Sequence, residues 1–293
     1  MASNAIHTTT LTPISWTRKL ANHFLTFFAT ASSIAVVIPL FAIFVYLVIK
    51  GIGSINLAFL TQIPKPVGES GGGMANAIVG SAIILAIASL IGIPLGIGAG
   101  IYLAEYGYNK LGNAVRFTAD VLNGIPSMVV GIAIYGLIVV VQKHFSALAG
   151  GVALGVMMIP MVSRTTEEML LLVPRMIREA AWGLGVTQWK TALSITLRTA
   201  SAGVITGVML AFARAAGETA PLLFTAFGNQ FWNFNINQPT AALPLQIFAY
   251  AISPFDEWHR LAWAGALILI LLIVAAVTAV RIVTSRGVMK GGA

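Results

Sequence analysis

Long runs without a charged residue are the feature that most limits how this chain can fold. Such runs, without Asp, Glu, Lys or Arg, include 20–49, 70–104, 121–142, 144–163 and 261–280. Each run reaches the ~20 residues that a helix needs to cross the hydrocarbon core of a bilayer. A helix satisfies its own backbone hydrogen bonds, which the bilayer interior requires. We therefore expect an all-α integral membrane protein.

A sixth apolar segment, from Thr199 to about residue 227, is interrupted only by Arg214 and Glu218. Charged residues make up 9% of the chain, whereas an ordinary soluble domain carries about 25%. The sequence thus predicts six transmembrane helices. Pro126 lies in the third of these and lacks a backbone donor, so we expect it to kink that helix.

The placement of basic residues predicts the orientation in the membrane. If the amino terminus is cytoplasmic, twelve of the 17 Lys and Arg residues fall in cytoplasmic segments and four in external ones. Short cytoplasmic loops are enriched in Lys and Arg. We therefore expect both termini in the cytoplasm, and we attribute the basic excess to topology rather than to nucleic-acid binding. The chain has no Cys and no pair of His at ligand spacing, so no metal site is predicted.

This topology divides the chain into five segments. The first apolar run is too long for a signal peptide and lacks a small-residue cleavage site, so we expect it to be retained. The predicted segments are a cytoplasmic tail at 1–21, a first transmembrane helix at 22–49, an external loop at 50–73, a core of five transmembrane helices at 74–284 and a cytoplasmic tail at 285–293.

The connection at 164–198, between the fourth and fifth spans, is unusually long and holds five basic and three acidic residues. Pro174 can start a short helix, Gly183 and Gly185 interrupt it, and Thr187 can cap a second one. We expect two short amphipathic helices joined by a glycine turn, which form a docking surface on the cytoplasmic face.

Six residues of this connection recur in a fixed spacing: Glu179, Ala180, Ala181, Gly185, Ile195 and Leu197. The spacing resembles the E-A-A-x3-G-x9-I-x-L-P loop of ABC-transporter permeases, with Arg198 in place of the final proline. The resemblance implies that this coupling loop docks in a cleft of a separate ATPase subunit. An ordinary amphipathic interfacial helix is the alternative.

The chain contains no G-x-x-x-x-G-K-[ST] phosphate-binding loop. We therefore expect a non-catalytic subunit that binds no cofactor of its own. ATP and magnesium would be held by the partner ATPase.

The segments "NGIPSMVVGI", "RAAGETAPL" and "ALPLQIFAYAISP" extend the resemblance to the PstA-type permeases of phosphate ABC transporters, over about residues 74–284. This resemblance implies the type I ABC importer permease fold and import of inorganic phosphate. The implied partners are a second, homologous permease in a heterodimer, two ATPase subunits and an external phosphate-binding protein. The implied location is the plasma (inner) membrane of a bacterium or archaeon.

Other functions remain open from the sequence. The chain could be an ABC permease for another oxyanion or small solute, or an ion-coupled secondary transporter that uses Arg214 and Glu218 as a relay. An intramembrane enzyme is disfavoured, because no nucleophile, base and metal ligands come together in the sequence.

Arg214 and Glu218 are costly to insert, because a charge at the bilayer centre costs at least ~3 kcal/mol. On a continuous helix they would share an arc of about 60° with Gly203 and Gly207. Two roles remain open for them. They could form an ion pair that only holds helices together, or Arg214 could bind a phosphate oxygen while Glu218 positions it.

Further candidates are polar residues along a path and small residues at helix contacts. The predicted substrate path or gate comprises Arg214, Glu218, Thr219, Asn123 and Ser127. Small residues four apart let helices approach closely in lipid, and the predicted packing positions are Gly92, Gly96, Gly100, Gly203 and Gly207. We also expect an ion pair between Arg116 and Asp120, four residues apart on one helix.

Overall fold

The fold is taken from a computed structural model, which describes residues 15–69 and 71–290, with side chains up to Thr284. The chain divides into two compact units, Met1–Ile49 and Lys50–Ala293. Across the described residues the regular elements are helices, and a single isolated bridge joins Phe227 to Thr240. The expected all-α class is therefore confirmed.

From residue 15 on, the first unit is formed by one long helix, α1 (Trp16–Gly51), which runs slightly past the end of that unit. It contains the predicted first span at 22–49 and also residues 16–21, which we had assigned to a tail. Residues 1–14 of that tail lie outside the described residues. Nearly all side chains of α1 are exposed although the helix is apolar, as expected of a segment surrounded by lipid.

The second unit is built from four long helices: α3 (Ala75–Glu105), α7 (Ala147–Leu171), α10 (Leu197–Ala216) and α13 (Asp256–Lys290). The shorter elements are η1 (Ile52–Ser54), α2 (Leu57–Thr61), α4 (Lys110–Gly124), α5 (Ser127–Ile134), η2 (Tyr135–Val139), α6 (Val140–Gln142), α8 (Arg175–Gly183), α9 (Gln188–Lys190), η3 (Thr191–Thr196), α11 (Ala220–Thr225) and α12 (Leu243–Ala251).

Helix α13 reaches Lys290, so most of the predicted carboxy-terminal tail at 285–293 continues this helix; residues 291–293 are not described. The limits of a charge-free run mark where a helix could cross a membrane. They do not mark where its hydrogen bonds end.

Helices α3 and α7 form the centre of the core. A Cβ added at Gly92 would lie 2.7 Å from the Cβ of Met158, one at Gly96 2.6 Å from that of Val162, and one at Gly100 2.5 Å from that of Thr166. Side chains at these three positions would therefore collide with α7. The stripe of glycines lets the two backbones approach closely, which van der Waals packing in lipid requires.

The third predicted span is broken rather than kinked. Helices α4 and α5 meet at an angle of 104° across Ile125 and Pro126. Pro126 cannot donate a helical hydrogen bond. The residue before a proline is also driven toward extended geometry, and Ile125 has φ −72° and ψ 133°. The expectation of one helix through this proline was therefore wrong, although the proline was the correct place for the irregularity.

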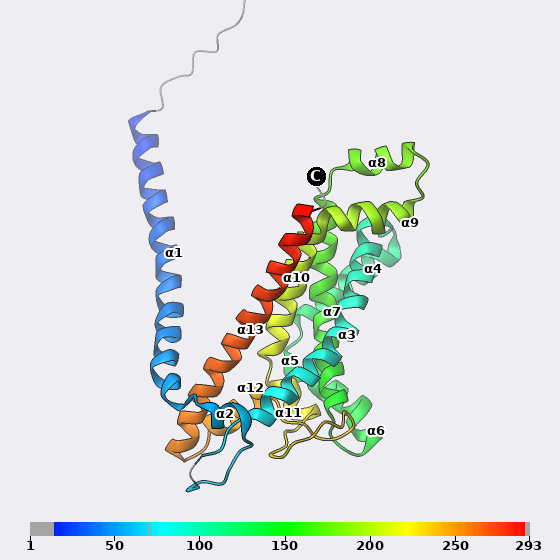
Figure 1. The fold of residues 1–293 in the computed structure, drawn as a ribbon. Coiled ribbons are helices and arrows are strands. Elements are labelled where there is room, and N and C mark those ends of the chain that lie inside the picture. The colour runs from blue at the N-terminus through cyan, green and yellow to red at the C-terminus, as the bar shows by residue number, and fades with distance from the viewer. Residues whose placement is uncertain (1–14, 70, 291–293) are drawn as a thin grey trace, which may run out of the picture. The chain divides into compact units, whose positions relative to one another are not determined.

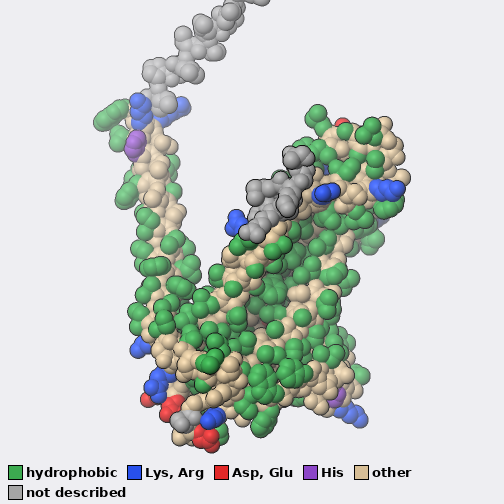
Figure 2. All heavy atoms as spheres, viewed as in Figure 1, with side chains coloured by type: hydrophobic (Ala, Val, Ile, Leu, Met, Phe, Trp, Pro, Cys, Tyr) green, Lys and Arg blue, Asp and Glu red, His purple; other side chains and the backbone are tan. Residues whose placement is uncertain are grey.

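Five helical segments are long and apolar enough to cross a membrane, and the bent pair α4–α5 with its continuation to Gln142 is a sixth candidate. The five are Trp16–Ser54, Ala75–Glu105, Ala147–Leu171, Gln188–Ala216 and Asp256–Thr284. In the second unit, α8 and α9 lie at one end of the bundle and α2 at the other (Figure 1). On the face shown in Figure 2, hydrophobic side chains cover the middle of this unit and charged ones gather toward its ends.

Candidate functional site

Helix α8 carries the Glu-Ala-Ala motif and is built by local signals at both of its ends. Pro174 stands immediately before it, with φ −56° and ψ 136°, a geometry that stops α7 from continuing and leads into a new helix. Gly183 is its last residue. Thr187 precedes α9 but makes no capping bond with its side chain.

The glycine of the motif ends α8 in a Schellman arrangement. Gly185 has φ +79°, its N–H donates to the carbonyl of Trp182 at 2.9 Å, and the N–H of Val186 donates to that of Ala181 at 3.0 Å. These two bonds satisfy carbonyls that the helix end would otherwise leave free. The spacing from the second alanine to the glycine is therefore the spacing of a helix cap.

The motif residues point in different directions. Ala181 is buried, whereas Glu179 and Ala180 are exposed, and Glu179 borders the pocket between α8 and the end of α3. Met176 and Leu184 are 77% and 86% exposed, so the outer side of α8 carries apolar side chains. The helix thus has an inner face that packs on the core and an outer face without a partner among the described residues.

The second half of the motif lies where α9 runs into α10. Ile195 belongs to the π-helical segment η3, and Leu197 is the first residue of α10. Both are partly buried, and Leu197 packs against the main core cluster. The second helix, which we expect to run into the fifth span, is continuous with it.

Arg178 fastens the inner face of α8 to the ends of two long helices. Its Nε donates to Oε1 of Glu105 at 3.0 Å, and its Nη1 and Nη2 donate to the carbonyls of Val173 and Leu170, each at 2.7 Å. The side chains of Arg178 and Glu105 are 10% and 4% exposed. A buried pair of this kind persists because hydrogen bonds replace the lost hydration of both charges.

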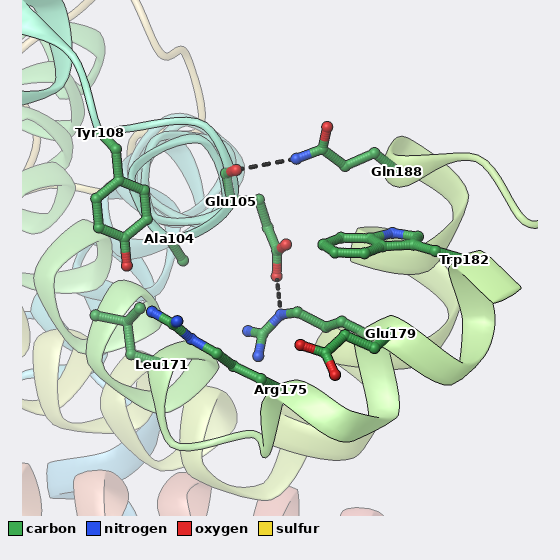
Figure 3. Close-up of a pocket in the computed structure, with 9 residues that line it drawn as sticks. Ala104, Glu105, Tyr108, Leu171, Arg175, Glu179, Trp182 and Gln188 are labelled. Atoms are coloured by element: carbon green, nitrogen blue, oxygen red, sulfur yellow. Dashed lines mark hydrogen bonds and ion pairs between the residues drawn. The ribbon is translucent and has the colours of Figure 1, made fainter.

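Glu105 also binds the first residue of α9, because Gln188 donates from Nε2 to the backbone carbonyl of Glu105 at 3.1 Å. Figure 3 shows Glu105 at the end of α3, with Gln188 on one side and Arg175 and Glu179 of α8 on the other. These side chains border a pocket of about 310 Å³, lined by Ala104, Glu105, Tyr108, Leu171, Arg175, Arg178, Glu179, Trp182 and Gln188.

A second arginine–carboxylate pair, with a half-buried arginine and a buried carboxylate, also lies at the carboxyl end of α3. Arg116 donates from Nε to Glu167 at 2.6 Å, and its Nη1 and Nη2 donate to the carbonyls of Gly107 and Leu103, each at 2.9 Å. The expected pairing of Arg116 with Asp120 was wrong. The guanidinium instead satisfies carbonyls at the carboxyl end of α3, where a cation is favoured. Asp120 lies 3.9 Å from Arg164 instead.

Arg214 and Glu218 form an ion pair, but not on a continuous helix. Helix α10 ends at Ala216, and α11 starts at Ala220. Pro221 has no N–H to continue the helical ladder, and glycine at 217 is a poor helix former. Nε of Arg214 lies 3.7 Å from Oε1 of Glu218. The expected single stripe of four residues on one helix is therefore corrected.

The two glycines of that stripe face α7. A Cβ at Gly203 would collide with the sulfur of Met169, and one at Gly207 would lie 2.5 Å from the hydroxyl of Thr165. Arg214 projects elsewhere, because its side chain is 52% exposed while that of Glu218 is 18% exposed. Within residues 15–69 and 71–290, Arg214 makes no side-chain hydrogen bond or ion pair beyond this one.

The break after α4 lies close to the break after α10. A Cβ at Gly131 of α5 would lie 2.6 Å from the Cα of Pro221 in α11. Ser127, half-buried, is the first residue of α5, and Thr219 immediately precedes α11. Asn123 is exposed near the end of α4, and no contact of its side chain with Arg214 is found in the described chain.

Sequence reasoning missed the two pairs that hold the α8 end together. Arg178 and Glu105 are 73 residues apart, and Arg116 and Glu167 are 51 apart. Neither distance corresponds to a helical spacing. A weak indication was available, because Glu105 is the charged residue that closes a run of 35 uncharged ones.

Comparison with known proteins agrees with this architecture. The family model "Binding-protein-dependent transport system inner membrane component" matches residues 92–287. The phosphate transport system permease protein PstA of Yersinia pestis is 48% identical over 240 residues, covering 82% of this chain and 81% of that protein. A probable phosphate transport system permease protein PstA of Methanocaldococcus jannaschii is 34% identical, covering 90% and 94%.

A solved structure gives a further likeness at the level of the fold. The inward-facing MetNI methionine ABC transporter superimposes with a TM-score of 0.56 at 17% identity, covering 74% of this chain and 96% of that chain. This identity is too low to carry function. It shows that the helices are arranged as in an ABC importer permease.

Proposed function

The chain belongs to the family of binding-protein-dependent transport system inner membrane components, and within it to the PstA-type permeases. From this premise we propose that it is the membrane-spanning permease subunit of an ATP-driven importer of inorganic phosphate. The observation that carries the proposal is its 48% identity to a phosphate transport permease over 82% of its length.

In this proposal the outer face of α8 docks on a separate ATPase subunit. The face offers the exposed apolar side chains of Met176 and Leu184, and the exposed Glu179 carboxylate lies at its edge, beside the pocket. Apolar anchors with a charged neighbour suit a protein interface, because the anchors supply affinity and the charge sets the register. The end of the bundle that carries α8 then faces the cytoplasm, in agreement with the positive-inside distribution of Lys and Arg.

The partners follow from the same assignment. A second, homologous permease completes the pathway as a heterodimer, two ATPase subunits hold ATP and magnesium, and an external binding protein delivers phosphate. This chain acts as a non-catalytic subunit in the plasma membrane of a bacterium or archaeon. The lack of a phosphate-binding loop in its sequence supports this division of labour.

Arg214 is our candidate for contact with phosphate along the pathway. Its guanidinium is more than half exposed in this chain and is oriented by Glu218 at 3.7 Å. A guanidinium presents forked donors that match phosphate oxygens. The neighbouring breaks at Pro126 and Gly217 place Ser127 and Thr219 at helix ends, where polar groups are available to line a path.

Reconstituted vesicles test the function. The full transporter, with ATP inside the vesicles and binding protein outside, is expected to accumulate radiolabelled phosphate. Uptake should stop when ATP or the binding protein is omitted and should continue when an ionophore collapses ion gradients.

Two outcomes would contradict the proposal. Phosphate uptake that needs an ion gradient but no ATP would indicate a secondary transporter. ATP-dependent uptake of sulfate or another solute, without phosphate uptake, would indicate a different cargo.

A further inference from the structure

Two arginine–carboxylate pairs lie at the carboxyl end of α3, and only one of them involves α8. Arg116 and Glu167 join α4 to α7, and Arg116 also binds carbonyls at and just beyond the end of α3. Arg178 and Glu105 have the same chemistry, but Arg178 belongs to α8. Only the second pair therefore reaches the helix that we propose to dock on the ATPase.

The attachment of α8 to the rest of the core is otherwise slight. The segment from Leu172 to Pro174 joins it to α7, and the glycine turn after Gly183 joins it to α9. Ala181 is its one buried apolar side chain, and Ile177 is partly buried against the core. A displacement of α8 could be absorbed by these short connections unless something fixes the helix to the long helices.

Arg178 supplies that fixation through three directed bonds. Its Nε binds Glu105 of α3, one terminal nitrogen binds the carbonyl of Leu170 in α7, and the other binds the carbonyl of Val173 in the segment that follows α7. The planar guanidinium holds these acceptors in one geometry, which the single ammonium of a lysine cannot do. Gln188 binds the carbonyl of the same Glu105, so α8 and α9 are tied to one residue.

We propose that Arg178, held by Glu105, is the positioning residue that transmits movement of α8 to α3 and α7 and so couples ATP hydrolysis to transport. This inference rests on the proposed function, because it assumes that an ATPase moves α8. Without the bonds of Arg178, α8 still docks on the ATPase and moves with it during the ATP cycle. The short connections at both ends of α8 then absorb the movement before it reaches the membrane helices.

The test is the ratio of phosphate transported to ATP hydrolysed, measured on purified transporter in vesicles. The variants are Arg178→Gln and the milder Glu105→Gln, which leaves the bonds of Arg178 to the carbonyls of Leu170 and Val173 in place. The ratio is independent of how much protein folds. We expect ATP hydrolysis to continue and the ratio to fall by about fivefold or more in Arg178→Gln, as for the loss of a typical coupling between sites, with a smaller fall in Glu105→Gln.

Arg116→Gln is the matched control. It removes a half-buried arginine that likewise donates to a buried carboxylate and to two backbone carbonyls, none of them in α8. The yield of assembled transporter should therefore fall while the ratio stays at the wild-type value. An unchanged ratio in both Arg178→Gln and Glu105→Gln, or an equal fall in Arg116→Gln, would overturn the inference. Failure of the wild-type transporter to couple phosphate uptake to ATP would instead refute the proposed function.

Discussion

Replacing Gly185 by alanine should weaken binding of the ATPase through backbone strain alone. The residue has φ +79°, and a Cβ added there would meet nothing within 4 Å. Steric contact is thus excluded as a cause. An L-residue in left-handed geometry costs roughly 1–2 kcal/mol, which is a factor of about 5 to 30 in an equilibrium. The fraction of molecules with a correctly capped α8 falls by up to that factor.

The affinity for the ATPase should fall by the same factor, because a partner that binds only the capped state has an apparent Kd that rises as the population of that state falls. Titration of detergent-purified transporter membrane subunits with labelled ATPase subunit measures this affinity. Gly185→Asn is the control, because asparagine tolerates left-handed geometry better than other side chains. We expect alanine to raise Kd by about 5- to 30-fold and asparagine to raise it much less.

A bulky charged residue should act more strongly. Gly185→Arg adds the same strain and places a long cation beside the docking face, so the ATPase should no longer co-purify. The reasoning fails if the alanine and asparagine variants bind equally well, or if Gly185→Arg retains a full complement of ATPase.

Three further outcomes follow from the geometry. Arg214→Ala should abolish phosphate uptake in vesicles while the transporter still assembles, because an ion pair so exposed contributes little to stability; normal uptake kinetics would remove this role. Gly96→Val should destabilise the core by about 1–3 kcal/mol or more through collision with Val162, whereas Gly98→Val, with nothing within 4 Å of its Cβ, should not; thermal unfolding in detergent compares them. Burial raises the pKa of Tyr250 above its usual 10.0. The folded state therefore holds the phenol proton more tightly than the unfolded state, and the free energy of unfolding should fall as the pH rises above 10. Unfolding of the wild type and of Tyr250→Phe, compared across that pH range, tests this.

Sequence reasoning succeeded where one local property decides the outcome. Charge-free runs of sufficient length identified the membrane helices, because the cost of charge in hydrocarbon dominates every competing term. The Glu-Ala-Ala motif could be placed because its glycine ends a helix within seven residues. Pro126 was located correctly as an irregularity, but the angle of 104° depends on what α5 packs against, which no local pattern contains.

Long-range polar contacts were beyond prediction for a physical reason. Arg116 had an acidic residue four positions away, but it binds Glu167 and two carbonyls at the end of α3. Those acceptors become close only after α3, α4 and α7 have packed. The same holds for Arg178 and Glu105, whose distance along the chain indicates nothing about their distance in space.

The wider turns of η3 have a consequence for chain length. A π-helical turn accommodates one residue more than an α-helical turn, so Thr191–Thr196 shifts α9 and α10 out of a common register. Gln188 before it reaches Glu105, and Gly203 and Gly207 after it face α7. Deleting one residue of η3 would make α9, η3 and α10 one regular α-helix. Either Gln188 or the two glycines would then be rotated by about 100° away from the element that it contacts.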